Sequence, residues 1–288
     1  MKYFPVLLFL IFSSSIFAQD KLAYRVFTGE GKKAEYKDIL KTVIKADVVF
    51  FGELHDNPVA HWLELEITKD LYNNKGKDLI LAAEMFETDN QLLIDEYFAG
   101  TIKESSFESE VRLWKNYGTD YKPLINFARE NGLKLIASNI PRRYASVVAS
   151  GGFEALQNLT SEALKYIAPL PIEYDSELAC YKDMLSMEGV PAGHANENLP
   201  KAQAIKDATM ANSIAKFWQK DQMIIHFNGS YHSDRHMGII WYLNNYVPSI
   251  KIATITTVLQ DDIDSLEKEN RDMADFVIVI PSSMTRTY

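Results

Sequence analysis

Cysteine is almost absent from this sequence, whose 288 residues contain only Cys180. A lone cysteine cannot form an internal disulfide bond, so packing alone must hold the fold together. The thiol lies in the apolar stretch Leu178-Ala179-Cys180-Tyr181, which is typical of a small buried side chain on a helix face. A role as a catalytic nucleophile is the alternative interpretation of this residue.

Positive charge is also in short supply. The chain has 30 lysine and arginine residues against 39 aspartate and glutamate residues, which gives a formal net charge of -9. Binding to nucleic acid depends on Lys and Arg side chains that neutralise phosphates, so this balance argues against nucleic acid as a partner. No stretch of the chain is basic and amphipathic enough to suggest binding to a membrane surface.

Several common reaction motifs are missing. The sequence has no Gly-x-Ser-x-Gly elbow, no phosphate-binding Gly-Lys-Ser/Thr loop, no Gly-x-Gly-x-x-Gly turn and no His-Glu-x-x-His pair. Serine hydrolases, nucleotide enzymes and common zinc peptidases therefore have no support here. The acidic run Asp261-Asp262-Ile263-Asp264 lacks the glycine and closing glutamate of a calcium loop, and we expect it to be a solvated turn.

An apolar run stands at the N-terminus, over residues 4–12, just after the basic Lys2. A basic start, a short apolar core and a small residue before the cut are typical of a secretory signal peptide, which we place over residues 1–18 with cleavage near Ala18. The core is too short to span a bilayer, and Gln19 rather than cysteine follows the cut. We therefore expect an exported protein, periplasmic or secreted, with no transmembrane segment and no lipid anchor in the mature chain.

Short apolar runs recur between longer segments of helical pattern. Runs of this length without polar alternation are typical of strands buried on both faces of a parallel sheet. The intervening segments are long enough to be crossover helices, and 61–73 has the apolar spacing of one. The expected strands cover residues 46–51, 79–83, 133–137, 223–227, 251–258 and 276–280.

The expected fold class is α/β, a mostly parallel central sheet flanked by helices. Two connections, about 87–131 and 142–221, are helical in pattern and longer than a simple crossover needs. We expect them to be helical insertions that form a cap or subdomain. Residues 19–288 then make up a single α/β domain.

Polar side chains follow the expected strands. In open parallel sheets, ligands bind beyond the carboxyl ends of the strands, so these positions are the first candidates for a site. The first strand leads into Gly52-Glu53-Leu54-His55, the second into Glu84 and the fourth into Gly229-Ser230-Tyr231-His232. The pattern Gly-x-x-His thus occurs twice. A glycine permits a sharp turn, and a histidine three residues later can point back over the strand tips.

Two imidazoles and two carboxylates are therefore expected to face one crevice. His55, Glu53, Glu84 and His232 are our candidate catalytic residues if the protein is an enzyme, because such groups suit acid–base chemistry. His55, Glu84 and His232 are also candidate ligands of a divalent transition metal. A polar organic ligand is the third possibility, and the residues alone do not choose between them.

Other polar residues near these strands have two interpretations each. His61 and His236 can belong to the site or can be helix caps and surface residues. Arg142 and Arg143 follow a proline after the third strand, where they can hold an anionic group or begin a solvated helix.

Taken together, five ordered motifs resemble the ChaN-like haem-binding family and, more widely, the Tiki proteases, TraB proteins and erythromycin esterases. The resemblance covers about residues 47–258 and implies a parallel α/β core with a helical subdomain and a role in haem or iron acquisition. The motifs are Gly52-Glu53-Leu54-His55-Asp56, Glu84-Met85-Phe86, Asn139-Ile140-Pro141-Arg142-Arg143, Gln203 through Asp207 to Met210-Ala211, and Gly229-Ser230-Tyr231-His232.

The resemblance also implies a ligand. Proteins of this family are dimers that enclose stacked haems, with a tyrosine as an iron ligand and a histidine assisting. A homodimer is therefore possible here, with cationic side chains near the haem propionates. The candidate haem-binding residues are Tyr121 first, then Tyr117 and Tyr144, together with Arg142, Arg143 and His236.

Two functions follow as alternatives. The first is an exported haem-binding protein that serves haem or iron uptake at the cell envelope and passes haem to an uptake partner. The second is a hydrolase, metal-dependent or metal-free, that uses the paired Gly-x-x-His motifs and the glutamates on an ester or peptide.

Overall fold

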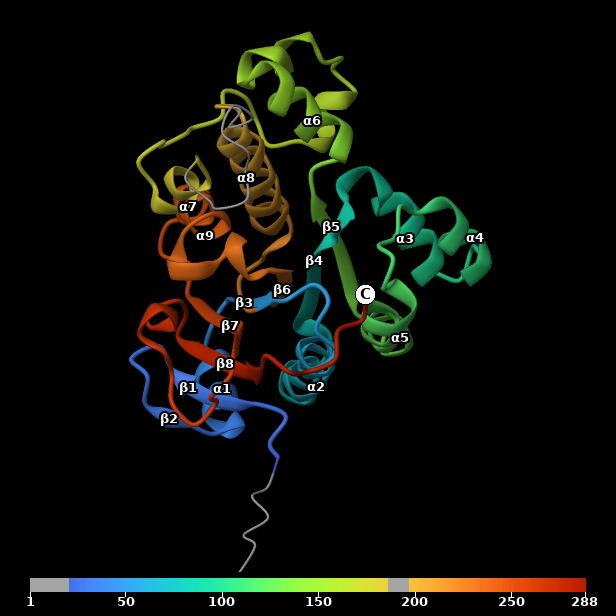
Figure 1. Cartoon of the computed structure of the whole chain (residues 1–288). Coiled ribbons are helices and arrows are strands. Elements are labelled where there is room, and N and C mark those ends of the chain that lie inside the picture. Colours follow the sequence, from blue (N-terminus) through green and yellow to red (C-terminus); the bar gives the residue numbers. More distant parts are fainter. Residues whose placement is uncertain (1–20, 186–196) are drawn as a thin grey trace, which may run out of the picture.

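The computed structural model describes residues 21–185 and 197–288, which form one twisted sheet covered by helices on both faces (Figure 1). The described strands follow the order β2-β1-β8-β7-β3-β6-β4-β5 in an eight-stranded sheet. The strands are β1 (Arg25–Thr28), β2 (Lys33–Ala34), β3 (Val48–Glu53), β4 (Leu79–Glu87), β5 (Lys134–Asn139), β6 (Met223–Gly229), β7 (Ile252–Gln260) and β8 (Phe276–Pro281).

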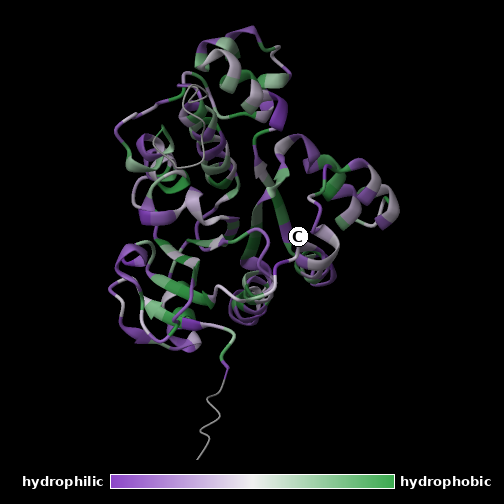
Figure 2. Cartoon of the chain, in the orientation of Figure 1, coloured by the Kyte–Doolittle hydropathy of each residue, from purple (hydrophilic) through white to green (hydrophobic). Residues whose placement is uncertain are grey.

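All neighbouring pairs from β8 to β5 are parallel, which confirms the expected α/β class. The short strand β1 pairs antiparallel with both β2 and β8 and so adds a mixed edge to the sheet. In Figure 2 the strands are mainly green, whereas the helices mix purple and white. Buried strands and amphipathic helices produce this contrast, because a strand covered on both faces has no side left for water.

The helices divide between the two faces of the sheet. Alternate residues of β3 show the division, since Val49 and Phe51 join one hydrophobic core while Val48 and Phe50 join the other. Helices α1, α2, α3 and α5 pack in the first core, and α6, α8 and α9 in the second. The helices are α1 (Tyr36–Val43), α2 (Pro58–Lys75), α3 (Gln91–Phe98), α4 (Glu104–Glu110), α5 (Lys122–Glu130), α6 (Arg142–Gly151), α7 (Ala179–Lys182), α8 (Leu199–Phe217) and α9 (Ile239–Tyr246).

Helix α2 begins directly after the first Gly-x-x-His motif. Asn57 caps it, since its side-chain oxygen accepts hydrogen bonds from the amides of Val59 and Ala60 at 3.0 and 3.2 Å, and Pro58 occupies the first turn. The cap fixes the direction in which the chain leaves β3. As a result, the side chains of His61 and Glu64, one helical turn apart, are buried.

The long connections contain most of the shorter helices. Residues 87–131 contain α3, α4, a π-helical turn at Tyr117–Tyr121 and α5, and in Figure 1 they lie to one side of β4 and β5. The described part of the second connection, residues 142–185 and 197–221, contains α6, α7 and α8 and lies above the sheet in the same view. Across the described ranges, 21–185 and 197–288, none of the helices has the length and apolar character needed to cross a membrane.

Candidate functional site

The two Gly-x-x-His motifs lie next to each other because β3 and β6 are neighbouring parallel strands. In their register Gly52 pairs with Asn228, and Glu53 pairs with Gly229. On the other side of β6, strand β4 pairs with it only as far as Ala83. A register shift follows in β4, and a bulge of this kind changes the direction of the next side chains. Glu84 comes immediately after that point.

Both positions need glycine because neighbouring atoms leave no room for a Cβ atom, and not because of the backbone conformation. Gly229 has a φ of −53°, and Gly52 is not among the described glycines with positive φ, so neither position needs glycine for a left-handed turn. A Cβ atom at Gly229 would lie 2.7 Å from Cε1 and Nε2 of His55. A Cβ atom at Gly52 would lie 2.9 Å from Cα of Ser230. The sequence suggested that each glycine permits a sharp turn. In the structure, the glycines instead allow the backbone to lie close to neighbouring residues.

His55 is held by the carboxylate that precedes it. Its Nδ1 donates to Oε1 of Glu53 at 2.7 Å, and the hydroxyl of Tyr121 donates to the same oxygen at 2.6 Å. The imidazole also meets the ring of Trp114 edge-on at 4.7 Å between centroids. The side chain of His55 is 38% exposed, whereas that of Glu53 is fully buried. With Nδ1 on Glu53, Nε2 is the nitrogen left toward Gly229 and the crevice.

The protonation of His55 follows from these neighbours. Burial by itself lowers the pKa of His55, but the hydrogen bond to Glu53 and the charge of Glu84 outweigh burial and raise the pKa above its usual value. An imidazole with one nitrogen held by a carboxylate and the other directed into a crevice can accept and release a proton there.

A second, fully buried group lies behind Glu53. Nδ1 of His61 is 3.1 Å from Oε2 of Glu64 and 3.5 Å from Oε2 of Glu53. Burial and the charge of Glu64 raise the pKa of Glu53 to about 8, and burial raises the pKa of Glu64 to about 8 as well. The sequence does not single out Glu64, although its spacing of three from His61 on an expected helix was a usable signal. Among the described residues, Glu53, His61 and Glu64 form a group of possible metal ligands, with one ligand atom from each lying within 4.8 Å of the others.

The other histidine of the pair, His232, lies between two carboxylates. Its Nδ1 donates to Oδ1 of Asp207, and its Nε2 lies 3.3 Å from Oε1 of Glu84. The remaining oxygen of Glu84 accepts a hydrogen bond from the amide of Gly229 at 2.7 Å. Asp207 comes from α8 and also accepts a hydrogen bond from the Tyr181 hydroxyl at 2.7 Å.

This arrangement favours an ion pair in the crevice. Burial lowers the pKa of His232, but the charges of Glu84 and Asp207 outweigh it and raise the pKa to about 10. Burial opposes ionisation of Glu84, yet the charge of His232 holds the pKa of that carboxyl well below its usual range. At neutral pH the crevice therefore contains an imidazolium and an ionised glutamate.

A fourth histidine, His226, lies beneath the site. His226, on β6, is fully buried and is hydrogen-bonded to the Ser138 hydroxyl and to Oδ1 of Asn228, each at 2.9 Å. Burial lowers its pKa to about 4, so it is neutral. Asn228 on the same strand and Ser138 on β5 hold the ring, so we interpret His226 as a structural residue.

An open hollow adjoins the crevice. A space of about 400 Å³ is lined by Trp114, Lys115, Arg142 and Tyr288 among others, and a smaller one of about 130 Å³ joins Trp114 and Arg142 to Glu84. The C-terminal end of the chain lies close by, in front of β5 in Figure 1. The hollow thus has an aromatic wall, cationic side chains and access to the polar crevice.

The candidate tyrosines occupy three different settings. Tyr121 is buried with its hydroxyl on Glu53, and burial together with the Glu53 charge raises its pKa far above the usual value. Tyr117 is buried too, and its hydroxyl has no hydrogen-bond partner among the described residues. Tyr144 is half-buried on α6 under the guanidinium of Arg143, 4.5 Å from the ring centroid.

The remaining candidates are spread more widely. Arg142 lines the hollow beside Trp114, whereas Arg143 forms an ion pair with Asp89 at 2.6 Å. His236 lies apart from the crevice, 3.3 Å from the Thr254 hydroxyl, and lines a different surface hollow.

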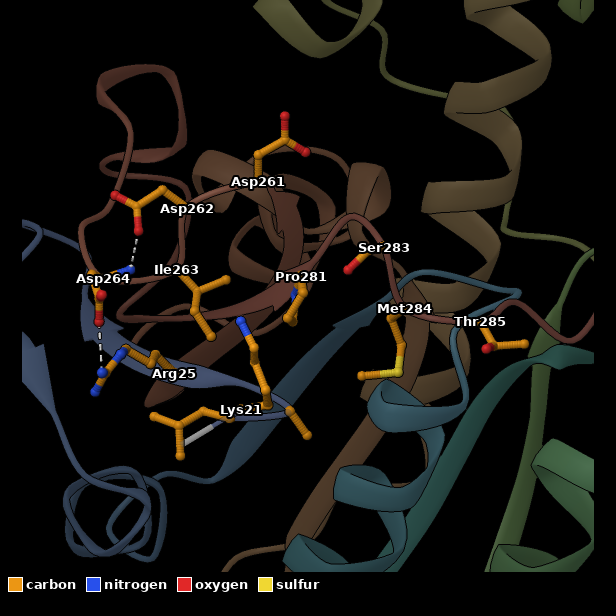
Figure 3. Close-up of a pocket in the computed structure, with 12 residues that line it drawn as sticks. Lys21, Arg25, Asp261, Asp262, Ile263, Asp264, Pro281, Ser283, Met284 and Thr285 are labelled. Atoms are coloured by element: carbon orange, nitrogen blue, oxygen red, sulfur yellow. Dashed lines mark hydrogen bonds and ion pairs between the residues drawn. The ribbon is translucent and has the colours of Figure 1, made fainter. Parts of the chain in front are cut away.

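A further hollow, of about 580 Å³, lies between the start of β1 and the segments that follow β7 and β8 (Figure 3). Lys21, Arg25 and the acidic run from Asp261 to Asp264 line it. Arg25 forms an ion pair with Asp264 at 2.6 Å. No residue of the strand-end crevice contributes to this hollow, so we do not connect it with the candidate site.

Comparisons with known proteins agree with this fold. A family model described as haem-binding uptake, Tiki superfamily, ChaN matches residues 39–243. The structure of ChaN from Campylobacter jejuni with cofacial haem superimposes with a TM-score of 0.69 at 19% identity, covering 90% of this chain and 97% of that one. A Bacillus cereus protein of known structure gives a TM-score of 0.51 at 14% identity, covering 90% and 95%. At these identities the two structures show the fold alone.

A plant protein is similar to most of this chain but is much longer. The chloroplastic protein RETICULATA-RELATED 5 of Arabidopsis thaliana is 25% identical over 284 residues, which cover 92% of this chain. The chain spans 38% of the length of that relative. The family model, in contrast, matches well over half of this chain. The chain belongs to the ChaN family of haem-binding uptake proteins in the Tiki superfamily.

Proposed function

We propose that this protein binds haem in the hollow beside Trp114 and serves haem or iron uptake at the cell envelope. Family membership supports haem as the ligand. The observation that carries the site is the contact between Trp114 and His55, which joins an aromatic wall to a partly exposed imidazole. Arg142 and Lys115 line the same hollow, and cations there suit the two propionates of a haem.

We assign the iron ligand to His55. The carboxylate of Glu53 holds its Nδ1, and a carboxylate on one ring nitrogen fixes the tautomer and increases the basicity of the other nitrogen as a metal ligand. Tyr121, the tyrosine implied first by the family resemblance, is buried, and its hydroxyl donates to Glu53. Ligation through Tyr121 requires that hydrogen bond to break and a phenol with a strongly raised pKa to ionise.

Hemin titration of the purified apoprotein tests this proposal. We expect a Soret shift that saturates. His55→Ala is expected to bind hemin at least about tenfold more weakly than the wild type does. His236→Ala is the matched control, because its side chain is exposed but lies in another hollow. Tyr121→Phe keeps the aromatic ring and is expected to retain binding. Absence of saturable binding refutes haem as the ligand, and loss of binding in Tyr121→Phe but not in His55→Ala refutes the assignment of the ligand.

We further propose that two copies enclose a pair of stacked haems. The structure of Campylobacter jejuni ChaN carries cofacial haem, and its fold covers most of this chain. The hollow beside Trp114 opens at the surface, so a second copy can face it across two haem planes. Sedimentation with and without hemin checks this, with a doubling of mass at one hemin per chain as the expected result. An unchanged mass at saturation contradicts it.

Export is part of the same proposal. A signal peptide over residues 1–18 would deliver the protein to the periplasm or the medium, where it would pass haem to an uptake partner. Intact-mass analysis of protein recovered from the periplasmic fraction checks the cut, with Gln19 expected as the first residue. Export is contradicted if the protein is found in the cytoplasmic fraction with residues 1–18 still attached.

The crevice itself supports hydrolysis as a second candidate function. Nε2 of His55 faces the side of the crevice that holds Glu84 and the protonated His232. In such a reaction His55 takes a proton from water, and the His232 imidazolium stabilises negative charge that develops on the substrate. A panel of simple esters and peptides tests this candidate, with turnover expected in the wild type and lost in His232→Ala. Equal rates in both proteins remove it.

A further inference from the structure

Three acceptor atoms converge in the buried group behind the crevice. Glu53 reaches it from the end of β3, while His61 and Glu64 reach it from the first turns of α2. Their side chains are 0–2% exposed. Nδ1 of His61 lies 3.1 Å from one oxygen of Glu64 and 3.5 Å from Oε2 of Glu53. These separations resemble those between ligand atoms that share one ion at about 2.0–2.2 Å in a tetrahedral site, about 3.3–3.6 Å.

The other ring nitrogen of His61 determines which atom carries the proton. Nε2 lies 3.1 Å from the backbone carbonyl oxygen of His55 and 3.6 Å from Oδ2 of Asp120. Both are acceptors, so Nε2 must be the donor, and in a neutral imidazole Nδ1 then presents a lone pair to the two carboxylates. Metal-binding histidines commonly donate their second ring N–H to a backbone carbonyl or a carboxylate in this way.

One oxygen of each carboxyl group has no hydrogen-bond partner among the described residues. These atoms, Oε2 of Glu53 and Oε1 of Glu64, are buried. The outer oxygen of Glu53, in contrast, accepts from both His55 and Tyr121, which leaves Oε2 directed at His61. Two buried carboxyl groups and an imidazole lone pair around one point are costly unless protons or a cation lie between them.

We propose that Glu53, His61 and Glu64 form a binding site for a divalent first-row transition metal ion, behind the proposed haem site and distinct from its iron. One imidazole nitrogen and two carboxylate oxygens are a ligand set that suits zinc, iron or manganese. Asp120 and the His55 carbonyl orient the histidine, and Tyr121 orients Glu53. This trio shares only Glu53 with the residues of the open crevice.

Metal binding by the tag-free protein tests the site. The full mature chain is dialysed against chelator and titrated with Zn²⁺ and, separately, Mn²⁺, with stoichiometry read by calorimetry and elemental analysis. We expect one equivalent of at least one ion to bind and to raise the melting temperature, because a ligand that binds only the folded state stabilises it. Glu64→Gln is expected to bind the ion about tenfold more weakly or worse.

Glu66→Gln is the matched control. It makes the same substitution two residues away on α2, at a partly exposed side chain that pairs with Lys69 at 2.8 Å, and it is expected to bind metal as the wild type does. Circular dichroism of both variants separates loss of a ligand from loss of fold. The proposal is overturned if the folded wild type takes up neither ion, or if Glu64→Gln binds as tightly as the wild type. It is also overturned if Glu84→Gln, rather than Glu64→Gln, abolishes binding.

Discussion

Replacing Gly229 with alanine tests whether close approach is the reason for the second glycine. The added Cβ would lie 2.7 Å from two atoms of the His55 ring, well inside van der Waals contact. The backbone at Gly229 has a φ of −53°, which alanine adopts without strain. Any effect of Gly229→Ala therefore comes from the contact with His55 and not from backbone conformation.

The loss of stability expected for Gly229→Ala depends on whether the His55 ring or strand β6 moves to relieve the contact. If the ring moves away, His55 loses its 2.7 Å hydrogen bond to Glu53 and its edge contact with Trp114. A side-chain hydrogen bond contributes about 0.5–1.5 kcal/mol net, and the partial exposure of His55 keeps its share near about 1 kcal/mol. If the ring stays, β6 must shift, and overpacking of this kind costs about 1–3 kcal/mol. The free energy of unfolding is thus expected to fall by about 1–3 kcal/mol.

Urea unfolding followed by circular dichroism measures the change, with the slope against denaturant expected to stay constant. Gly118→Ala is the control, because no heavy atom lies within 4 Å of its added Cβ and its φ is not positive. It is expected to change stability by less than about 0.5 kcal/mol. In a double-mutant cycle, His55→Ala should remove most of the penalty of Gly229→Ala. Equal stability of the two alanine variants, or no coupling in the cycle, refutes the reasoning.

Two further predictions concern buried titratable groups. His226 has a pKa of about 4 when folded against about 6.5 when unfolded, so its contribution is complete above pH 6.5 and is lost as the pH falls. The destabilisation measured for His226→Gln should shrink by about 2 kcal/mol between about pH 7.5 and pH 5, and a constant difference contradicts the buried neutral ring. Burial raises the pKa of Cys180 to about 11, so thiol reagents at about pH 8 should label it only after unfolding, whereas rapid stoichiometric labelling of the folded protein contradicts this setting.

The central strands could be predicted because both of their faces are buried, and each expected run overlaps a strand of the sheet. The antiparallel edge formed by β1 and β2 could not be predicted in this way. Strand β2 has two residues, Lys33 and Ala34, and β1 has four, so neither shows a hydrophobic period. The pairing of β1 with β8 is a tertiary contact between chain segments about 250 residues apart. Strand β4 also continues past the expected end at residue 83, because the bulge changes the direction of its side chains without ending the strand.

The candidate site shows a similar limit. The paired motifs were visible because each contains its own glycine and histidine. Asp207, the second carboxylate beside His232, stood out only as part of a family motif, since α8 is buried nearly all round and its pattern does not separate a polar face. Glu64, the nearest carboxylate to His61, was not singled out. Tyr121, the first candidate for an iron ligand, donates its hydroxyl to Glu53, a contact that its sequence position does not indicate. Which acceptor a buried donor finds depends on the packing of distant segments, and sequence spacing does not contain that information.

Charge in the crevice also constrains how a haem can enter. Glu84 is ionised, and Asp207 places a second carboxyl behind the single positive charge of His232. Haem propionates would be repelled by this end of the site and attracted to Arg142 and Lys115, which line the wider hollow. In the proposed complex, the haem edge that carries the propionates would therefore point outward from the sheet. The cations would fix the orientation of the haem, and the carboxyl groups of Glu84 and Asp207 would disfavour the reverse one.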